Sequence, residues 1–189
     1  MSKKTFGIGI IGCGVIGQKR GNALGEGGKL VACADKDINR AKTLATVSNA
    51  IVFEDWEALL EFPEVEIVII ATLHESLVQI TLAAIEAGKH VLVEKPAARF
   101  AKELVPVIKA SKKSKVKVHV GFNHRYHRSL RKAKEIIDSE ALGKLMFIRA
   151  RYGHGGRVGY DKEWRAKPKL SGGGELIDQG PHLIDLSRW

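Results

Sequence analysis

Thr5-Phe-Gly-Ile-Gly-Ile-Ile-Gly-Cys-Gly-Val-Ile-Gly17 is an apolar run that ends in the glycine pattern Gly12-x-Gly14-x-x-Gly17. Gly12 permits a tight turn out of a strand, and Gly14 lets backbone amides approach a diphosphate. Gly17 lets the following helix pack closely on the strand. The N-terminus of that helix, with its unpaired N–H groups and macrodipole, favours an anion. The stretch therefore predicts a strand, a phosphate-binding turn and a helix.

An acidic residue, Asp35, closes the next apolar run. Its carboxylate is placed to accept hydrogen bonds from the ribose hydroxyls of an adenosine, which favours NAD over a cofactor with a 2′-phosphate. The negative charge of Asp35 would repel a 2′-phosphate. The positive charges of Lys36 and Arg40 would partly offset this repulsion, so NADP stays possible. A glycine pattern alone is also typical of an ordinary glycine-rich turn. The preceding strand, the following helix and the acid near the expected distance favour dinucleotide binding instead.

Apolar runs alternate with helical patterns down to about residue 140. Their near-continuous aliphatic content is typical of strands buried on both faces of a sheet. The expected strands are 5–11, 29–34, 50–53, 65–71, 89–94 and 116–121, and the expected helices are 15–25, 36–46, 55–61, 75–87 and 99–113. This alternation predicts an α/β fold with a Rossmann-type, doubly wound parallel sheet. Pro106 predicts a kink or a late start in the last of these helices.

The pattern changes after residue 122. A basic helix is expected over 129–139, a strand over 145–152, a glycine-rich loop over 153–174 and a helical segment over 175–189 that Pro181 bends or starts. One strand and one helix cannot close a second core. We therefore expect a dinucleotide-binding domain over residues 1–122 and an incomplete start of an α+β substrate domain over residues 123–189.

The composition is that of a soluble globular protein, with 44% apolar and 28% charged residues in 189. No apolar run approaches the roughly 20 residues that span a bilayer. The N-terminus has no signal-peptide layout. Cys13 and Cys33 lie in or beside expected strands, which argues against a disulfide scaffold or a zinc site. We expect a cytoplasmic protein with no metal and no membrane partner.

The net charge of +10 raises the local concentration of anions. Nucleotides and phosphorylated or nucleotide-linked sugars are anions, and so is nucleic acid, although a solvated basic surface is the commoner reason for such a charge. The basic residues are not interleaved with the aromatic side chains that stack on single strands. No helix-turn-helix or zinc-finger spacing occurs. We therefore expect no nucleic-acid partner.

Two segments carry residues with catalytic chemistry. Lys95, in Glu94-Lys95-Pro96, follows the fifth expected strand, and ligands of open α/β sheets bind beyond the carboxyl ends of strands. Its bond to Pro96 is a candidate cis peptide. Asp178 and His182 are four residues apart and would share a helix face, where the carboxylate orients the imidazole. Taken singly, each element also fits a surface lysine or a capping acid beside an ordinary histidine.

A third segment, Gly121-Phe-Asn-His-Arg-Tyr126, follows the sixth expected strand. Asn123 and Arg125 would face the same crevice. His124 and His127 lack a carboxylate or a cysteine at metal-ligand spacing, so supporting or surface roles are expected for them.

Together these segments resemble the Gfo/Idh/MocA oxidoreductases, the relatives of glucose–fructose oxidoreductase and inositol dehydrogenase. The resemblance covers essentially the whole chain and includes Trp164-Arg165 and the run Gly172-Gly-Gly-x-x-x-Asp178-x-Gly180-x-His182. It implies that Lys95, Asp178 and His182 are the catalytic residues. The cofactor-binding residues that it implies, together with the glycine pattern, are Gly12, Gly14, Val15, Ile16, Gly17, Asp35, Lys36, Thr72, Leu73, His74, Glu94, Lys95, Asn123, Arg125, Trp164 and Arg165.

The chain departs from the family pattern in two places. The family usually carries Thr-Pro-Asn-x-x-His after its fourth strand, whereas this chain has Thr72-Leu-His-Glu-Ser-Leu77. Thr72 and the backbone at 73–74 remain as contacts. The chain also stops seven residues after His182, so most of the family's antiparallel substrate-binding sheet is missing.

The resemblance implies a hydride transfer between NAD(P) and a secondary alcohol or its ketone. The implied substrate is a sugar, a polyol or a nucleotide-sugar, and the full-length family form is implied to be a homo-oligomer. An alternative is a truncated, catalytically impaired module that binds a dinucleotide without turnover. A nucleic-acid-binding protein is the third interpretation.

Overall fold

The computed structural model describes residues 4–46, 48–153 and 158–189. The chain forms two compact units, Met1–Val120 and Gly121–Trp189, and each is described by itself.

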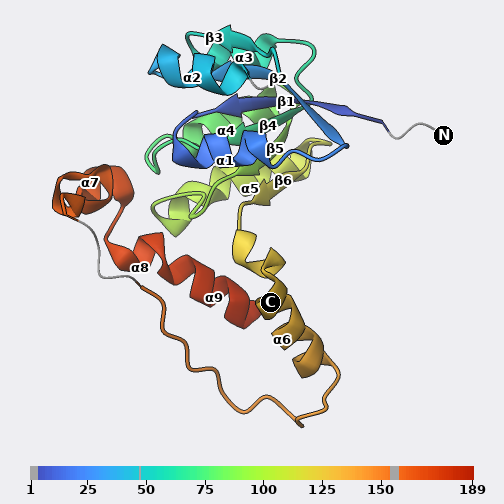
Figure 1. Cartoon of the computed structure of the whole chain (residues 1–189), viewed down its shortest axis with the longest axis vertical. Helices are drawn as coiled ribbons and strands as arrows, with labels where there is room; N and C mark the ends of the chain where they lie inside the picture. The colour runs from blue at the N-terminus through green and yellow to red at the C-terminus, as the bar shows by residue number, and fades with distance from the viewer. Residues whose placement is uncertain (1–3, 47, 154–157) are drawn as a thin grey trace. The chain divides into compact units, whose positions relative to one another are not determined.

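The first unit is built on a parallel sheet of six strands (Figure 1). They are β1 Phe6–Ile11, β2 Gly28–Ala34, β3 Ile51–Phe53, β4 Ile67–Ile70, β5 His90–Val93 and β6 Val118–Val120. Their order in the sheet is β3-β2-β1-β4-β5-β6. Successive strands are added on one side of β1 as far as β3, and the chain then crosses to the other side to add β4, as in a doubly wound dinucleotide-binding fold. The expected Rossmann-type fold is confirmed. Five strands lie within their expected ranges, and β2 begins one residue earlier than expected, at Gly28.

Helices cover both faces of this sheet (Figure 1). They are α1 Val15–Asn22, α2 Ile38–Ala45, α3 Trp56–Glu61, α4 Leu77–Glu86, the 3₁₀ turn η1 Ala101–Glu103 and α5 Leu104–Lys113. Successive strand residues point to opposite faces. Ile10 and Ile69 therefore join a core cluster with α2, whereas Ile11 and Ile70 join a second cluster with α3, α4 and α5.

The last helix of the first unit begins late, as Pro106 predicts. The 3₁₀ turn η1 comes first, and Pro106 is the third residue of α5. Proline is tolerated there because the first N–H groups of a helix have no partner within it.

The second unit consists of short helices and extended chain. Its elements are η2 Asn123–Tyr126, α6 Arg128–Asp138, η3 Tyr160–Lys162, η4 Trp164–Ala166, α7 Pro168–Ser171, α8 Glu175–Asp178 and α9 Gly180–Arg188. The loop expected over 153–174 thus contains three short helices, and its positions 154–157 lie outside the described residues. No helix among the described residues is long and apolar enough to cross a membrane.

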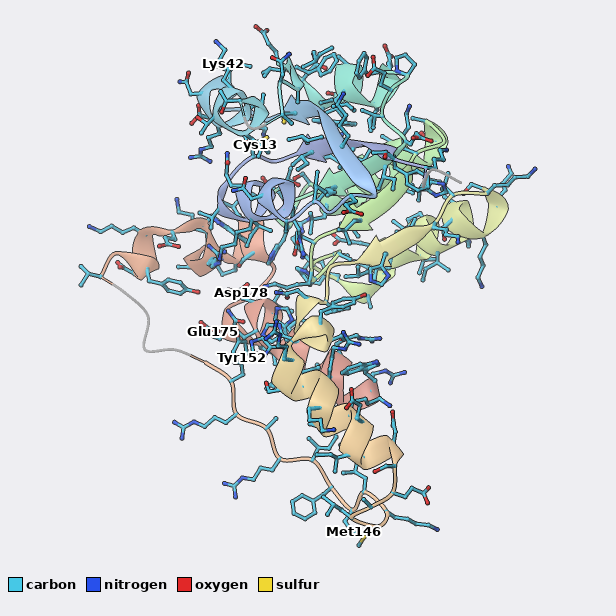
Figure 2. All side chains as sticks on the ribbon, turned by 45° about the vertical axis from the view of Figure 1, so that its right-hand side comes forward. Cys13, Lys42, Met146, Tyr152, Glu175 and Asp178 are labelled. Carbon is cyan, nitrogen blue, oxygen red and sulfur yellow. The ribbon has the colours of Figure 1, made fainter. Side chains whose placement is uncertain are left out.

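One expectation for the second unit is wrong and another is confirmed. Residues 145–152 are extended but form no strand, because a strand needs a hydrogen-bonded neighbour as well as an apolar sequence. Figure 2 shows Met146 on this segment, where its side chain is 87% exposed. The helical segment over 175–189 is interrupted at Gln179, and Pro181 lies in the first turn of α9, as its position predicts.

Candidate functional site

The glycine turn after β1 has the geometry that its sequence predicts. Gly12 has φ +90°, a conformation that glycine adopts without strain. A Cβ at Gly17 would lie 2.0 Å from the Gly12 carbonyl oxygen, so only glycine allows this packing of α1 on the turn. A Cβ at Gly14 would meet no protein atom within 4 Å. The backbone at Gly14 is therefore open to a ligand at the start of α1.

Asp35 lies beside this turn, at the end of β2. Its Oδ2 accepts a hydrogen bond from the Cys13 backbone N–H at 2.6 Å, and its Oδ1 accepts one from the Asp37 N–H at 2.8 Å. Each ionised oxygen has a further lone pair. The carboxylate is therefore held in place and can still accept hydrogen bonds from two hydroxyl groups.

The surroundings of Asp35 are polar and accessible. Gln18 Nε2 donates to the carbonyl oxygens of Cys13 and Arg40, which ties α1 to α2. Lys36 is exposed, and Arg40 pairs with Asp37 at 3.2 Å. Val15 and Ile16 present exposed side chains in the first turn of α1.

The segment after β4, the strand next to β1 in the sheet, contains Thr72, Leu73 and His74. The Ser76 hydroxyl donates to Thr72 Oγ1 at 2.9 Å and also approaches the Leu73 carbonyl at 3.0 Å. The His74 side chain is buried, so backbone contacts suit this position better than a ring contact.

Lys95 follows β5, in a turn that begins with Glu94 and contains a cis bond between Lys95 and Pro96. Glu94 makes an ion pair that the sequence did not suggest. Arg20 of α1 donates from Nε to Glu94 Oε1 at 2.6 Å, and only 26% and 12% of the two side chains are exposed. This pair joins the helix that begins at the glycine turn to the segment that carries Lys95.

Asp178, in the second unit, ends α8 and is buried. Its Oδ2 accepts hydrogen bonds from Arg165 Nε at 3.2 Å and from Gln179 Nε2 at 3.3 Å. The Arg165 guanidinium also lies 4.6 Å from the centre of the Trp164 ring. Because the helix breaks at Gln179, Asp178 and His182 lie on two consecutive short helices and not on one continuous face.

His182 lies among aromatic rings of the second unit. It is 4% exposed, and its ring centre is 3.9 Å from that of His124. Phe122 and Tyr152 each lie 6.3 Å from it, centre to centre. Figure 2 shows Tyr152 on the extended chain after α6 and Asp178 on α8. Sequence reasoning gave His124 a supporting or surface role, and the structure places it directly against His182.

Arg125 is engaged within its own unit. It donates from Nε to Asp185 Oδ2 at 2.7 Å, and this hydrogen bond raises the pKa of Arg125 above its usual value. The carboxylate of Asp185 is buried in α9. Asn123, the other residue expected to face the cofactor, is exposed at the start of η2.

The site residues thus form two groups. Gly12, Asp35 and Lys95 belong to the first unit, whereas Asp178 and His182 belong to the second. Sequence reasoning missed Arg20 and Asp185, whose partners lie 74 and 60 residues away along the chain. Within the described parts of the chain, no three side chains of the metal-binding types gather into a possible ion site.

Known families and proteins resemble this chain over most of its length. Residues 6–122 match the model of an oxidoreductase family with an NAD-binding Rossmann fold, Gfo/Idh/MocA, and residues 130–189 match a C-terminal domain of the same family. Inositol 2-dehydrogenase 2 of Saccharopolyspora erythraea is 30% identical over 98% of this chain and 53% of its own length.

Solved structures show the same likeness. The crystal structure of myo-inositol 2-dehydrogenase from Lactobacillus plantarum has a TM-score of 0.88 and 26% identity, over 98% of this chain and 56% of that one. The myo-inositol dehydrogenase from Lactobacillus casei, solved with NAD(H) and myo-inositol, has a TM-score of 0.68 and 26% identity, over 74% and 43% of the two chains. The chain therefore spans about half the length of the relatives it matches.

Proposed function

Because the chain belongs to the Gfo/Idh/MocA oxidoreductase family, we propose that its first unit binds NAD and that the protein is a polyol dehydrogenase. The observation that carries this proposal is the glycine turn with its fixed carboxylate. Gly14 leaves room for a diphosphate at the start of α1, and Asp35 offers acceptors for two ribose hydroxyls. NAD, when bound, supplies the hydride acceptor for the oxidation of an alcohol.

The proposed substrate is a cyclic polyol or a sugar with a secondary alcohol. Three relatives that match 98% of this chain are inositol 2-dehydrogenases by name, and one related structure was solved with NAD(H) and myo-inositol. Such substrates are neutral and present several hydroxyl groups. A site that binds such a substrate therefore needs mainly polar side chains, which hold one of these hydroxyl groups in position.

In this proposal His182 accepts the proton of the substrate hydroxyl. The neutral imidazole can act as a general base near neutral pH. Lys95 donates a hydrogen bond to the same oxygen and stabilises the negative charge that develops there. Asp178 supports the histidine, and the hydrogen bonds from Arg165 and Gln179 hold its carboxylate in place.

A binding experiment tests the first half of the proposal. NAD is titrated into the protein and into Gly14→Ala, with Gly25→Ala as the matched control. Both glycines have open space where a Cβ would lie, so both variants should fold. Only the Gly14 methyl group meets the diphosphate, and we expect it to weaken NAD binding by about tenfold, equivalent to about 1.4 kcal/mol. Equal NAD affinity in the two variants would contradict the proposed site.

A turnover experiment tests the second half. Formation of NADH is followed with a panel of inositols and sugars for the protein, Lys95→Ala and His182→Ala. Turnover that falls by roughly a hundredfold or more in both variants, with NAD binding retained, supports the proposed roles. NAD binding without turnover on any member of the panel would instead support the alternative, a dinucleotide-binding module.

A further inference from the structure

The first unit contains a cavity of about 210 Å³ that the proposed dehydrogenase site does not use. It lies in the layer where α4 and α5 cover β5 and the edge strand β6. The residues that line it are Thr81, Val93, Ala97, Leu104, Val107, Ile108, Ser111, Val118 and Val120. All belong to the first unit, and none is charged. The wall is therefore apolar except for two hydroxyl groups.

Those two hydroxyl groups differ. The Ser111 hydroxyl donates a hydrogen bond to the Ile108 carbonyl at 3.1 Å, as is common within helices. Thr81, in α4, is only 2% exposed, and its Oγ1 has no hydrogen-bond partner. A buried hydroxyl without a partner carries a free-energy cost, because it has lost its hydrogen bonds to water and gained none in return. A group that entered the cavity and bonded to Thr81 would remove that cost.

The cavity also adjoins the turn that carries Lys95. Val93 and Ala97 line it, and they flank Glu94-Lys95-Pro96 on either side. Ala97 has φ +69°, an unusual and strained conformation for a residue with a side chain. An occupant of the cavity would therefore contact both ends of this turn from the side of α4 and α5.

We propose that this cavity is a second ligand site, which binds a small neutral molecule with an apolar ring and one hydroxyl group. The ring packs against the aliphatic wall, and the hydroxyl bonds to Thr81 Oγ1. Threonine in a helix has two accessible χ1 rotamers, which allows its oxygen to turn toward a ligand. The absence of charged side chains from the lining argues against an ionic ligand.

The size of the cavity agrees with this ligand class. An apolar cavity of about 150 Å³ in another protein binds benzene. This cavity is open on the side of Ile108, which is 49% exposed, so a ligand can enter it from solvent. Phenol, a benzene ring with a single hydroxyl group, is therefore the simplest probe.

The test is a titration of the ¹³C-methyl-labelled chain with phenol, followed by NMR. We expect the methyl signals of Val93, Ala97 and Val120 to shift together to saturation, whereas those of Ile8 and Leu44, in the other core cluster, stay in place. Thr81→Val removes the hydroxyl and keeps the shape. It should weaken phenol binding by roughly threefold to tenfold and leave toluene binding unchanged.

A blocking variant and its control complete the test. Ser111→Phe places a ring in the cavity and should abolish the shifts, with Ser111→Leu as a smaller replacement if the first variant does not fold. Val105→Phe puts the same ring at an exposed position of α5 that does not line the cavity, so binding should remain. Unmoved methyl signals at the solubility limit of phenol, or undiminished binding in Ser111→Phe or Thr81→Val, would overturn the proposal.

Discussion

Asp35 has two tasks at the scale of a single residue. Its carboxylate accepts backbone N–H groups from Cys13 and Asp37, which fixes the glycine turn against the start of α2. In the proposed function the same carboxylate binds the ribose. Asp37, two residues later, is a useful contrast. Its Oδ1 accepts the Asn39 N–H at the start of α2, and its Oδ2 pairs with Arg40.

The comparison of Asp35→Asn with Asp37→Asn separates these tasks. Each variant replaces a charged acceptor of a backbone N–H by a neutral amide, so each should lose about 1 kcal/mol of stability. That loss corresponds to about 2–4 °C in Tm for a chain of this size. NAD affinity, measured by titration, should fall in Asp35→Asn alone. Equal NAD affinity in both variants would show that Asp35 has only the structural task.

At this scale the sequence predicts backbone roles better than side-chain partners. The roles of Gly12 and Gly17 follow from local spacing, and the structure confirms the turn and the close packing. Arg20 and His124 acquire their contacts through tertiary packing, which no local pattern encodes.

At the scale of elements, the pair between Arg20 and Glu94 joins α1 to the segment after β5. The two side chains are mostly buried, so their attraction is screened less than that of an exposed pair. Lys4 and Glu66 make an ion pair of similar length, but 67% and 36% of these side chains are exposed.

A double-mutant cycle with Arg20→Met and Glu94→Gln should give a coupling free energy of about 1–2 kcal/mol from denaturant unfolding. The matched cycle with Lys4→Met and Glu66→Gln should give less than about 1 kcal/mol, because the pair is exposed. The interpretation fails if the Lys4 cycle gives the larger coupling. The NAD affinity of Arg20→Met then shows whether the link between α1 and the segment after β5 contributes to NAD binding.

The start of α5 predicts a pH dependence of stability. Burial alone would raise the pKa of Glu103, but the N–H groups of Phe100 and Arg99 and the Arg99 guanidinium outweigh it, so the pKa lies below its ordinary value of 4.5. A carboxylate whose pKa is lower in the folded state than in the unfolded state stabilises the protein at pH values above the unfolded-state pKa. This contribution is lost as the pH falls through the folded-state pKa.

Glu103→Gln should therefore lower Tm by a few degrees at neutral pH, and the difference from the unmodified protein should shrink as the pH falls below about 4.5. Scanning calorimetry over an acid pH series measures both effects. Glu61→Gln, at an exposed position in α3, is the control and should show no such convergence. A Tm difference for Glu103→Gln that does not change with pH would contradict this account.

The elements of the first unit could be predicted because each strand finds a parallel neighbour in the same chain. The apolar run over 145–152 looks equally strand-like, yet it has no paired strand in the structure. The expectation that Asp178 and His182 share one helix face is wrong for a local reason. Asp178 and His182 have helical spacing, but Gly180 and Pro181 begin a new helix between them.

At the scale of the whole molecule, the two units differ in how far their large apolar side chains are buried. Those of the first unit gather into two core clusters against the sheet. In the second unit many large ones are exposed, namely Leu142, Leu145, Met146, Phe147, Ile148, Leu176 and Ile184. Apolar surface of this kind favours association.

We expect the purified chain to self-associate, with a mass by light scattering that rises with concentration above the 20.7 kDa of one chain. Met146→Asp with Phe147→Asp should reduce this association, because both side chains are at least 78% exposed and a charge opposes apolar contact. Ile51→Asp, at an exposed site on β3 of the first unit, is the matched control and should not reduce it. A single-chain mass at every concentration would contradict the expectation.

The double engagement of Asp35 also constrains how relatives of this protein can diverge. A lineage that exchanged its acid for a smaller residue to admit a phosphorylated ribose would, in the same mutational step, release the turn from the helix beside it. Adaptation to a different redox pool would then require a compensating substitution elsewhere. In the proposed function, cofactor preference and thermal stability are thus coupled through one side chain.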